Sequence, residues 1–413
     1  MSEWKEKTIG ELSIRVSSGL TPLKSNKEFW ENPIIPWLKT DQLGEKYIFD
    51  TNTKISKEAL EQTSLRIYPE NTISIAMYGE GKTRGNLSII KAPMTTNQAC
   101  CNIELDTKLA DVEYVYYYLK TQYDALRKLS SGVRKNLNSN DIKNYKIYIP
   151  ESVSFQKSIV RILTSLDNKI SVNNQINQEL EAMAKTLYDY WFVQFDFPDQ
   201  NGKPYKSSGG KMVYKPELKR EIPEGWGVEK LSSILEIGRE TINPMKTPKE
   251  EFKYYSIPEY DVSGSFSYEL GETIKSNKFL VEKSDLLVSK LNPWFNRVVY
   301  NLEESAISST EFIVWKTFNR FEKNFLYQVA TSEGFIEYCT RFATGTSNSH
   351  KRVSPDIMIG FQIPFEKTYI QKFGKIIDSI RTQVLQNNKQ NQELTQLRDW
   401  LLPMLMNGQV KVE

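Results

Sequence analysis

The 413-residue chain has very few residues suited to acid–base, zinc or disulfide chemistry: one histidine, His350, and three cysteines, Cys100, Cys101 and Cys339. A single histidine excludes sites built from several histidines. An odd number of cysteines, two of them adjacent, fits neither a disulfide framework nor metal-ligand spacing, so we expect buried thiols. No acidic cluster has the spacing of a metal-dependent nuclease. The sequence is more typical of a binding protein than of an enzyme.

Long apolar runs are also missing. No segment approaches the roughly 18 to 20 apolar residues of a membrane span. The start, MSEWKEKTIG, lacks the apolar core of a signal peptide, so we expect a cytoplasmic protein. Hydrophobic residues make up 39% and charged residues 25% of the chain, which is typical of a soluble globular protein. The length exceeds that of one compact core and suits two domains.

The net charge of +3 says little about a partner, but the positive charge is grouped. Residues 128 to 146 contain five basic residues and one acidic residue: Lys128, Arg134, Lys135, Lys143 and Lys146 against Asp141. A basic cluster of this kind indicates a polyanionic partner such as nucleic acid.

Nearly the same polar octapeptide occurs twice, as NNQINQEL at Asn173–Leu180 and NNKQNQEL at Asn387–Leu394. Other matches occur in the same order: Trp4 with Trp226, TTNQAC (95–100) with SSTEFI (308–313), and IYIP (147–150) with FQIP (361–364). Such self-similarity predicts two copies of one unit. We expect a first globule at 1–152, a first helix at 153–199, a solvated Gly/Pro/Ser/Lys-rich linker at 200–222, a second globule at 223–365 and a second helix at 366–413.

Each copy changes character along its length. Short Ile- and Tyr-rich segments such as NTISIAMY, GNLSII and YKIYIP predict a β-rich globule, and SDLLVSKL, NRVVY and EFIVWK are their counterparts. A long helix should follow, from about 155 to 192 in the first copy. The predicted fold class is α+β: two mixed, β-rich globules separated by two long antiparallel coiled-coil-like helices, with a pseudo-two-fold internal repeat.

A heptad pattern of apolar residues runs along both helices. We place one seam at Ile162, Leu166, Ile176, Leu180, Met183 and Leu187, and the other at Ile376, Ile380, Leu394, Leu397 and Leu401. Asn173 and Asn387 then fall at a positions, where a buried amide penalises a shifted register. The alternative is a locally solvated coil in which these amides face water.

The stretch AMYGEGKT, residues 76–83, satisfies a relaxed phosphate-loop pattern. A phosphate loop needs a helix directly after the Lys-Thr pair, because the helix N-terminus faces the phosphates. Here RGNLSII follows, which predicts a strand. We therefore favour a basic hairpin loop carrying Lys82 and Arg84 over a nucleotide site.

The segment NPWF, residues 292–295, is similar to the Asn-Pro-Pro-aromatic loop of adenine methyltransferases, but the second proline is missing. No Gly-rich strand-to-helix turn for S-adenosylmethionine accompanies it. A turn with Trp294 and Phe295 packed beneath it is the simpler interpretation. Asn292 and Arg297, with Lys290 nearby, could still reach a partner.

Two polar basic loops occupy matching places just before the Ile-Pro of each copy: SSGVRKNLNSND (130–141) and TGTSNSHKRVSPD (344–356). Their Arg, Lys, Asn and His side chains suit phosphates and base edges. The match between TTNQAC and SSTEFI places Asn97 and Gln98 opposite Thr310 and Glu311. Different polar residues at equivalent places are what two readers of different half-sequences need. The alternative is a hydrated polar face without a ligand.

With these features assembled, the chain resembles the specificity subunit of type I restriction-modification systems over nearly its whole length. The resemblance rests on the duplicated layout, the Trp near the start of each half, and the helix ends ELEAMAKTLYDYWFVQFDF (179–197) and LRDWLLPMLMNGQV (397–410). It implies two target-recognition domains, each reading half of a split sequence in double-stranded DNA.

The resemblance also implies partners. Two methyltransferase subunits carrying S-adenosylmethionine would dock on the helices, and restriction subunits that use ATP and Mg²⁺ would join them. No cofactor is expected in this chain. Two alternatives remain: a nucleotide-binding or methyltransferase enzyme, and a coiled-coil scaffold that does not bind DNA.

Base-reading residues vary within this family, so the DNA contacts are predicted from loop position and chemistry. We expect the globules to occupy neighbouring major grooves, about 34 Å apart. The predicted phosphate contacts are Lys82, Arg84, Arg134, Lys135, Lys351 and Arg352. The predicted base contacts are Asn97, Gln98 and Asn136 in the first half, and Asn292, Arg297 and Glu311 in the second. Lys290 and His350 are expected to contribute to the same surface.

Overall fold

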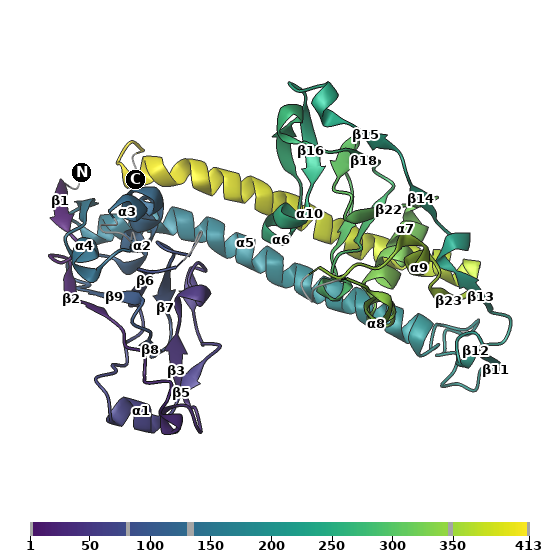
Figure 1. Ribbon diagram of the computed structural model, residues 1–413, viewed down its shortest axis with the longest axis horizontal. Coiled ribbons are helices and arrows are strands. Elements are labelled where there is room, and N and C mark those ends of the chain that lie inside the picture. Colours follow the sequence, from purple (N-terminus) through teal and green to yellow (C-terminus); the bar gives the residue numbers. More distant parts are fainter. Residues whose placement is uncertain (1–2, 80–82, 130–135, 346–349, 411–413) are drawn as a thin grey trace. The chain divides into compact units, whose positions relative to one another are not determined.

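The structure is a computed structural model that describes residues 3–79, 83–129, 136–345 and 350–410. The chain divides into two compact units (Figure 1). The first unit contains Met1–Val172 and Gln390–Glu413, and the second contains Asn173–Lys389. Among the described residues, every helix is too short or too polar to cross a bilayer.

The first unit is built on a five-stranded sheet of order β2-β9-β6-β7-β4. Its strands are β2 (Ser13–Ser18), β9 (Cys100–Leu105), β6 (Ile73–Ala76), β7 (Leu87–Ile90) and β4 (Tyr47–Ile48). Strands β6 and β7 are buried at every position, as expected of continuous apolar runs at the centre of a sheet. They coincide with the predicted strands in NTISIAMY and GNLSII.

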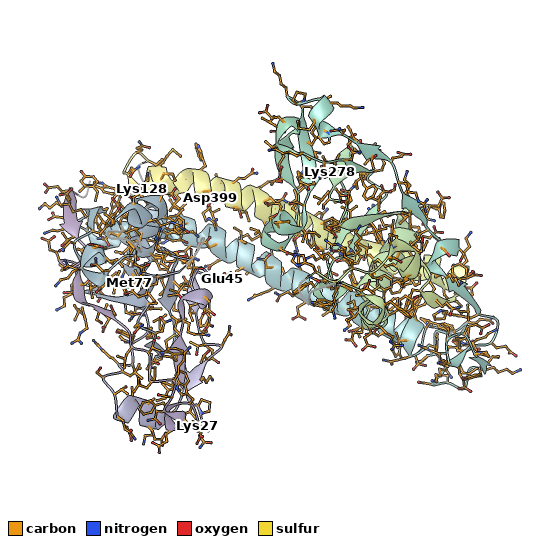
Figure 2. All side chains as sticks on the ribbon, viewed as in Figure 1. Lys27, Glu45, Met77, Lys128, Lys278 and Asp399 are labelled. Carbon is orange, nitrogen blue, oxygen red and sulfur yellow. The ribbon has the colours of Figure 1, made fainter. Side chains whose placement is uncertain are left out.

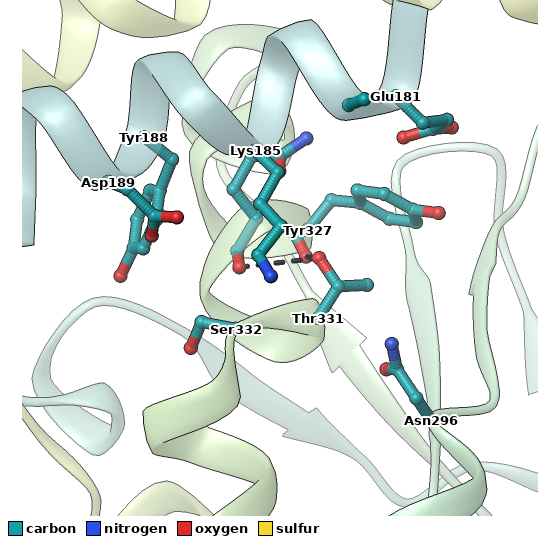
Figure 3. A pocket seen from close by; sticks show the side chains of 10 residues that line it. Glu181, Lys185, Tyr188, Asp189, Asn296, Tyr327, Thr331 and Ser332 are labelled. Carbon is teal, nitrogen blue, oxygen red and sulfur yellow. Dashed lines mark hydrogen bonds between the residues drawn. The ribbon is translucent and has the colours of Figure 1, made fainter. Parts of the chain in front are cut away.

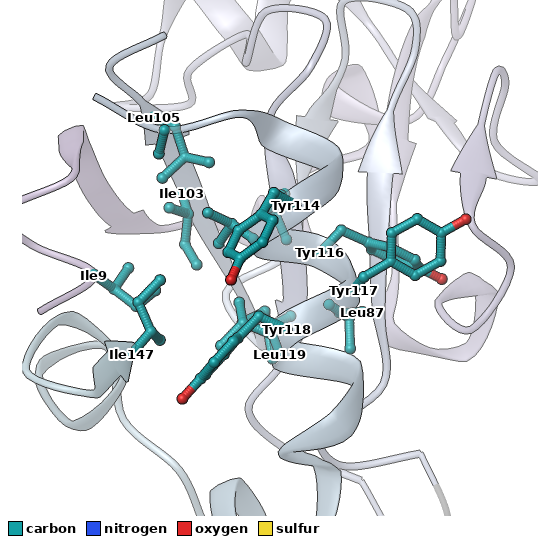
Figure 4. Packing of buried hydrophobic residues seen from close by; sticks show 14 of the residues in the cluster. Ile9, Leu87, Ile103, Leu105, Tyr114, Tyr116, Tyr117, Tyr118, Leu119 and Ile147 are labelled. Carbon is teal, nitrogen blue, oxygen red and sulfur yellow. The ribbon is translucent and has the colours of Figure 1, made fainter. Parts of the chain in front are cut away.

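Helix α2 (Val112–Thr121) covers this sheet. Asp111 caps the helix by accepting hydrogen bonds from the amides of Glu113 and Tyr114. Its tyrosines enter the core from two sides: Tyr114 and Tyr118 point one way, and Tyr116 and Tyr117 point the other (Figure 4). Ile103 and Leu105 of β9 lie on the side of Tyr114 in the same cluster (Figure 4). The helix therefore anchors the hydrophobic core of the first unit.

The remaining elements of the first unit surround this core. Strands β1 (Trp4–Thr8) and β10 (Lys146–Pro150) pair antiparallel, and β3 (Ile35–Leu38), β5 (Lys54–Ile55) and β8 (Thr95–Thr96) form a small sheet. The short helices are α1 (Lys57–Glu61), α3 (Tyr123–Lys128) and α4 (Ser139–Lys143). Side chains fill the interior, where Met77 at the end of β6 is buried (Figure 2).

The second unit repeats the central topology of the first. Its four-stranded sheet has the order β14-β22-β19-β20, with strands β14 (Glu236–Gly238), β22 (Phe312–Lys316), β19 (Leu286–Ser289) and β20 (Val298–Tyr300). All three pairings are antiparallel, as are those of β2-β9-β6-β7. The predicted internal repeat is therefore confirmed by strand order and direction.

A second sheet distinguishes this unit. It has five strands: β15 (Thr241–Ile242), β18 (Lys278–Val281), β21 (Ala306–Ser308), β16 (Glu251–Tyr255) and β17 (Ser267–Leu270). Strands β13 (Gly227–Lys230) and β23 (Gln362–Phe365) pair as β1 and β10 do. The helices are α6 (Ile257–Ser263), α7 (Arg320–Thr331), α8 (Glu333–Phe342) and α9 (Pro355–Ile359).

The segment predicted as a solvated linker, 200–222, is more ordered than expected. Strands β11 (Met212–Lys215) and β12 (Arg220–Pro223) form an antiparallel hairpin, and Ile222 is buried. Next to it, Phe197 stacks between the rings of Tyr205 and Trp226 at centroid distances of 4.9 and 5.0 Å. Aromatic packing thus ties this segment to the core of the second unit.

Two long helices contribute residues to both units: α5 (Val153–Tyr188), which continues as a π-helical turn at Asp189–Val193, and α10 (Lys367–Met406). In the first unit, Asp167 of α5 pairs with Arg398 of α10 at 2.9 Å. In the second unit, Glu181 pairs with Arg381 at 2.6 Å. Later residues of one helix face earlier residues of the other, so the helices are antiparallel. The predicted fold class is confirmed.

The predicted heptad seam is only partly correct: its a positions Asn173 and Asn387 are buried, but several of its apolar positions are exposed. Ile176, Met183, Ile376 and Leu397 are all more than 40% exposed, whereas Asn177, Ala184 and Ile377 are buried. Polar residues occupy buried seam positions, notably Asn177 and Arg381. Because some buried positions are polar, a search for apolar residues alone assigns part of the buried face of each helix to the adjacent face.

The two register asparagines are both buried, so the alternative of a solvated coil is wrong. Their arrangement differs from the prediction. Asn387 Nδ2 donates to Asn177 Oδ1 at 2.8 Å, and Asn177 Nδ2 donates to Asn388 Oδ1 at 2.7 Å. Asn173 lies one turn before Asn177 on α5. Among the described residues of the second unit, the side-chain amides of Asn177, Asn387 and Asn388 connect the two helices.

Candidate nucleic-acid interface

Three loops meet in the second unit beside the ends of β19 and β22. Residues 290–297 connect β19 to β20, residues 309–311 lead into β22, and residues 350–353 precede α9. We call this surface the second platform. It gathers every residue of the second half that we predicted to contact DNA.

Backbone hydrogen bonds hold the second platform together. The Lys290 amide donates to the carbonyl of Glu311 at 2.9 Å, and the Val353 amide donates to the carbonyl of Lys290 at 3.1 Å. The Asn292 amide donates to the carbonyl of Lys351 at 2.8 Å. Because the contacts are between backbones, the frame does not depend on which side chains it presents.

The first unit has the same frame. The Met77 amide donates to the carbonyl of Ala99 at 2.8 Å, and the Leu137 amide donates to the carbonyl of Met77 at 3.1 Å. We call residues 77–86, 97–99 and 136–138 the first platform; its members 80–82 lie outside the described residues. Both platforms thus lie at the same edge of the repeated sheet.

This frame corrects one alignment made from the sequence. Cys100 N–H bonds to the carbonyl of Asn97, and Phe312 N–H bonds to that of Ser309. Asn97 is therefore equivalent to Ser309 rather than to Thr310, and Glu311 is equivalent to Ala99 rather than to Gln98. The sequence match between these two segments was therefore out of register by one residue.

Glu311 and Arg352 form the main ion pair of the second platform. The guanidinium donates from Nε and Nη2 to the carboxylate at 2.9 and 3.0 Å, which raises the pKa of Arg352. Lys290 and Lys351 form no ion pair within the described part of the chain, and His350 is exposed. The surface keeps uncompensated positive charge, which suits a polyanion.

Two residues predicted to read bases form structural contacts within the second unit. Asn292 is 7% exposed, and its Oδ1 accepts a hydrogen bond from the Lys351 amide at 3.0 Å. Arg297 donates to both oxygens of Asp261 at 2.6 and 2.8 Å and to the carbonyl of Leu291 at 3.4 Å. In this conformation both side chains support the loop. Asp261 was not predicted, since nothing in its local sequence marks it.

The NPWF turn is arranged differently from the prediction. It forms the short helix η7 (Pro293–Phe295), flanked by Asn292 and Asn296 in the left-handed region. Phe295 is 58% exposed, so the expectation that its ring packs beneath the turn is wrong. The Arg297 guanidinium lies 4.6 Å from the centre of this ring. The turn therefore presents an aromatic ring to solvent.

The first platform carries different side chains on the same frame. Gln98 is exposed, whereas Asn97 and Asn136 are partly buried. Asn97 Oδ1 accepts a hydrogen bond from the Ala99 amide at 3.1 Å, which fixes its loop. The carbonyl of Arg84 accepts a hydrogen bond from Arg127 at 3.3 Å. Lys82, Arg134 and Lys135 lie outside the described residues.

The phosphate-loop alternative fails on topology. Ala76 is the last residue of β6, and β6 pairs antiparallel with the next strand, β7. No helix begins after Thr83, and a phosphate would find no helix N-terminus there. The three cysteines are buried and unpaired, as predicted, and burial raises the pKa of Cys100 to about 12. The described residues include no group of side chains suited to hold a metal.

A cavity of about 370 Å³ lies in the second unit between α5 and α7 (Figure 3). Glu181, Tyr188 and Asp189 line one side, and Tyr327 and Asn296 line the other. Burial raises the pKa of the Asp189 carboxyl. None of the residues predicted to contact DNA lines the cavity, which shares Asn296 with the second platform.

Comparison with known proteins gives consistent results. A family model described as the type I restriction modification DNA specificity domain matches residues 1–182. The type I restriction enzyme MjaIX specificity subunit of Methanocaldococcus jannaschii is 28% identical, covering 100% of this chain and 94% of that protein. The EcoR124I/EcoR124II specificity subunit of Escherichia coli is 30% identical over 48% of each chain.

The fold has a solved counterpart. The crystal structure of the S subunit of a type I restriction-modification system from M. genitalium superposes with a TM-score of 0.57 at 16% identity. The superposition covers 98% of this chain and 96% of that chain. The duplicated sheet topology, the two long helices and these matches agree. The chain is similar over its whole length to type I restriction-modification DNA specificity subunits.

Proposed function

We propose that each unit reads one half of a split sequence in double-stranded DNA through its platform. The observation that carries this proposal is the repeated backbone frame with dissimilar side chains. Amides predominate on the first platform, and a Glu–Arg pair with two lysines occupies the second. Because the two backbone frames are alike, both platforms would be positioned on DNA in the same way. Because their side chains differ, they would prefer different bases.

Phosphate contacts supply most of the affinity in this proposal. Lys290, His350 and Lys351 would approach the backbone from the second platform. Arg84 would do so from the first, with the predicted Lys82, Arg134 and Lys135. Binding should weaken steeply with salt, because each neutralised phosphate releases counterions.

The long helices α5 and α10 are proposed to set the gap between the half-sites. Sites in neighbouring major grooves on one face of the duplex are about 34 Å apart. Helices of 36 and 40 residues are stiff enough to keep such a distance constant. A fixed gap would make the target bipartite with an invariant spacer.

The partners proposed are two methyltransferase subunits, and restriction subunits through them. The exposed apolar residues of the helices offer docking surfaces: Ile176, Met183 and Ile376 in the second unit, and Leu397 and Trp400 in the first. S-adenosylmethionine would belong to the methyltransferases, and ATP and Mg²⁺ to the restriction subunits. This chain would act as a recognition subunit without a cofactor of its own.

Selection from a random duplex library tests DNA reading directly. The full chain with its methyltransferase subunits should retain one bipartite motif. Replacing residues 1–152 with another recognition domain should change only one half of that motif. Inserting four residues, about one helical turn, into both α5 and α10 should change the spacer. Retention of no common sequence would contradict the proposal.

A second experiment separates docking from DNA reading. Ile176→Glu with Met183→Glu should reduce co-purification of the methyltransferase subunit, because charge is placed on an apolar contact surface. Lys375→Glu, at an exposed position of α10, is the matched control for added negative charge. Unchanged assembly in the double variant would place the docking surface elsewhere.

A further inference from the structure

The Arg352 side chain is held in one orientation by Glu311. Three donor–acceptor distances between them lie from 2.9 to 3.2 Å, and all use Nε and Nη2 of the guanidinium. Arg352 is 45% exposed at its side chain and Glu311 is 25% exposed. A bidentate pair of this geometry restricts the plane of the guanidinium.

The backbone of Arg352 is fixed as well. It forms antiparallel bridges with Leu291 on one side and Thr344 on the other. The amide of Arg352 donates to the carbonyl of Thr344, and the Thr344 amide donates to that of Arg352, both at 2.8 Å. Few residues of the second platform are constrained in both backbone and side chain while remaining exposed.

One edge of this guanidinium is still available. Glu311 occupies the edge formed by Nε and Nη2, which leaves the two hydrogens of Nη1 and one of Nη2. One hydrogen of Nη1 and the remaining hydrogen of Nη2 point along the free edge and form a second pair of parallel donors. Guanine presents two acceptors, O6 and N7, in the major groove, and a bidentate arginine is their best partner.

Charge decides between a phosphate and a base as the target. The carboxylate of Glu311 cancels most of the charge of Arg352, so the pair is poorly suited to neutralise a phosphate. Neutral base acceptors require orientation more than net charge. Lys290 and Lys351 on the same platform have no acidic partner among the described residues and suit phosphates better.

We propose that Arg352 reads a guanine of the second half-site through its Nη1–Nη2 edge, and that Glu311 is the residue that positions it. This inference rests on the proposed function and names the base recognised at that site. The first platform has Asn136 and Ala99 at the equivalent places, so it lacks the pair. The two halves must therefore differ in the base read at this position.

The test replaces each guanine of the selected target in turn by 7-deazaguanine, which removes N7 and keeps base pairing. Wild-type protein should lose roughly 10-fold in affinity at one guanine of the second half-site. Arg352→Ala and Arg352→Lys should bind the normal and modified duplexes equally. Lys375→Ala, which removes one exposed positive charge from α10, should keep the wild-type sensitivity.

Glu311→Gln tests positioning separately. Without the carboxylate, Arg352 keeps its charge but loses its orientation. Sensitivity to 7-deazaguanine should fall, while affinity for non-target DNA should rise and its salt dependence should steepen by about one unit of slope. A merely structural residue would not increase non-target binding.

Two results would overturn the inference and leave the proposed function standing. One is that Arg352→Ala binds all duplexes more weakly by the same factor and still loses affinity when guanine is replaced by 7-deazaguanine. That result would indicate a phosphate contact. The other is a second half-site without guanine. Failure of the wild-type complex to select any sequence would instead refute the proposed function. Unchanged recognition of the other bases of the second half-site shows that the second unit of each variant is folded.

Discussion

The first unit places a carboxylate, Asp167, at the position of its helix where the second unit places a guanidinium, Arg381. Both residues face a tyrosine of the covering helix: Tyr117 hydrogen-bonds to Asp167, and the Arg381 guanidinium lies 4.0 Å from the ring centre of Tyr327. The ion-pair partner also changes sign, from Arg398 to Glu181. The repeated backbone therefore carries reversed charges at its helix contacts.

The covering helices differ in the same way. Early in α2, Glu113 accepts hydrogen bonds from Tyr47, Thr164 and Lys46. Early in α7, Lys323 instead donates to backbone carbonyls, including that of Lys283 at 2.7 Å. Topology is shared, but the covering helix carries a carboxylate in the first unit and a buried ammonium group in the second.

Arg381→Asp is expected to have the largest effect, since it gives the second unit the charge of the first. It would bury a carboxylate beside Glu181 and should cost at least about 3 to 5 kcal/mol in unfolding free energy. Chemical denaturation followed by hydrogen exchange of peptides from each unit would measure it. Lys375→Ala is the control, and partial recovery in Arg381→Asp with Glu181→Arg would confirm that charge is the cause.

Lys323 should make the second unit respond to pH. Burial lowers its pKa from 10.5 to about 7. Between these two pH values, Lys323 is protonated in the unfolded chain and neutral in the folded chain. The free energy of unfolding should therefore increase as the pH rises from 7 to 10.5, and decrease again when the pH is lowered. The change should be at most about 5 kcal/mol. In Lys323→Met, hydrogen exchange of the second unit should no longer show this dependence of stability on pH. The same pH dependence in the variant as in the wild type would contradict the assignment to Lys323.

Asp167→Asn tests the matching contact of the first unit with a smaller effect. Asp167 and Arg398 are each nearly a fifth exposed at their side chains, whereas Arg381 is almost fully buried. Loss of the charged hydrogen bond should cost about 2 kcal/mol. Hydrogen exchange should accelerate in the first unit only. Equal acceleration in both units would show that their helix contacts are not independent.

Glu113→Gln should have the smallest effect at neutral pH, about 1 kcal/mol, because the amide still forms part of the hydrogen-bond network. Burial alone would raise the pKa of Glu113, but hydrogen bonds from Tyr47 and Thr164 and the charge of Lys46 outweigh it and lower the pKa below 4.5. Its stabilising contribution is therefore present above pH 4.5 and lost as pH falls through the lowered value. As the pH is lowered, the stability of the first unit in the wild type and in Glu113→Gln should become equal, and acid denaturation of this unit would measure it.

Much of the fold could be predicted from local sequence. Apolar runs gave the central strands, and the predicted helix from about 155 to 192 agrees with α5 and its π-helical turn. The octapeptides predicted the repeat that strand order confirms. The helix seam could not be predicted in this way. Asn177 and Arg381 are polar residues in buried places, and burial there depends on partners about 200 residues away.

The sequence by itself determined the repeat, the β-rich globules, the long helices and the loops that carry polar and basic side chains, because these follow from composition and periodicity over short windows. Only the tertiary structure decided what the loop residues do. Arg297 is bound by Asp261 and Asn292 by Lys351, whereas Arg352 keeps one edge open beside Glu311. These differences arise from contacts between distant segments, and a side chain's free hydrogen-bonding capacity is known only after those contacts have formed.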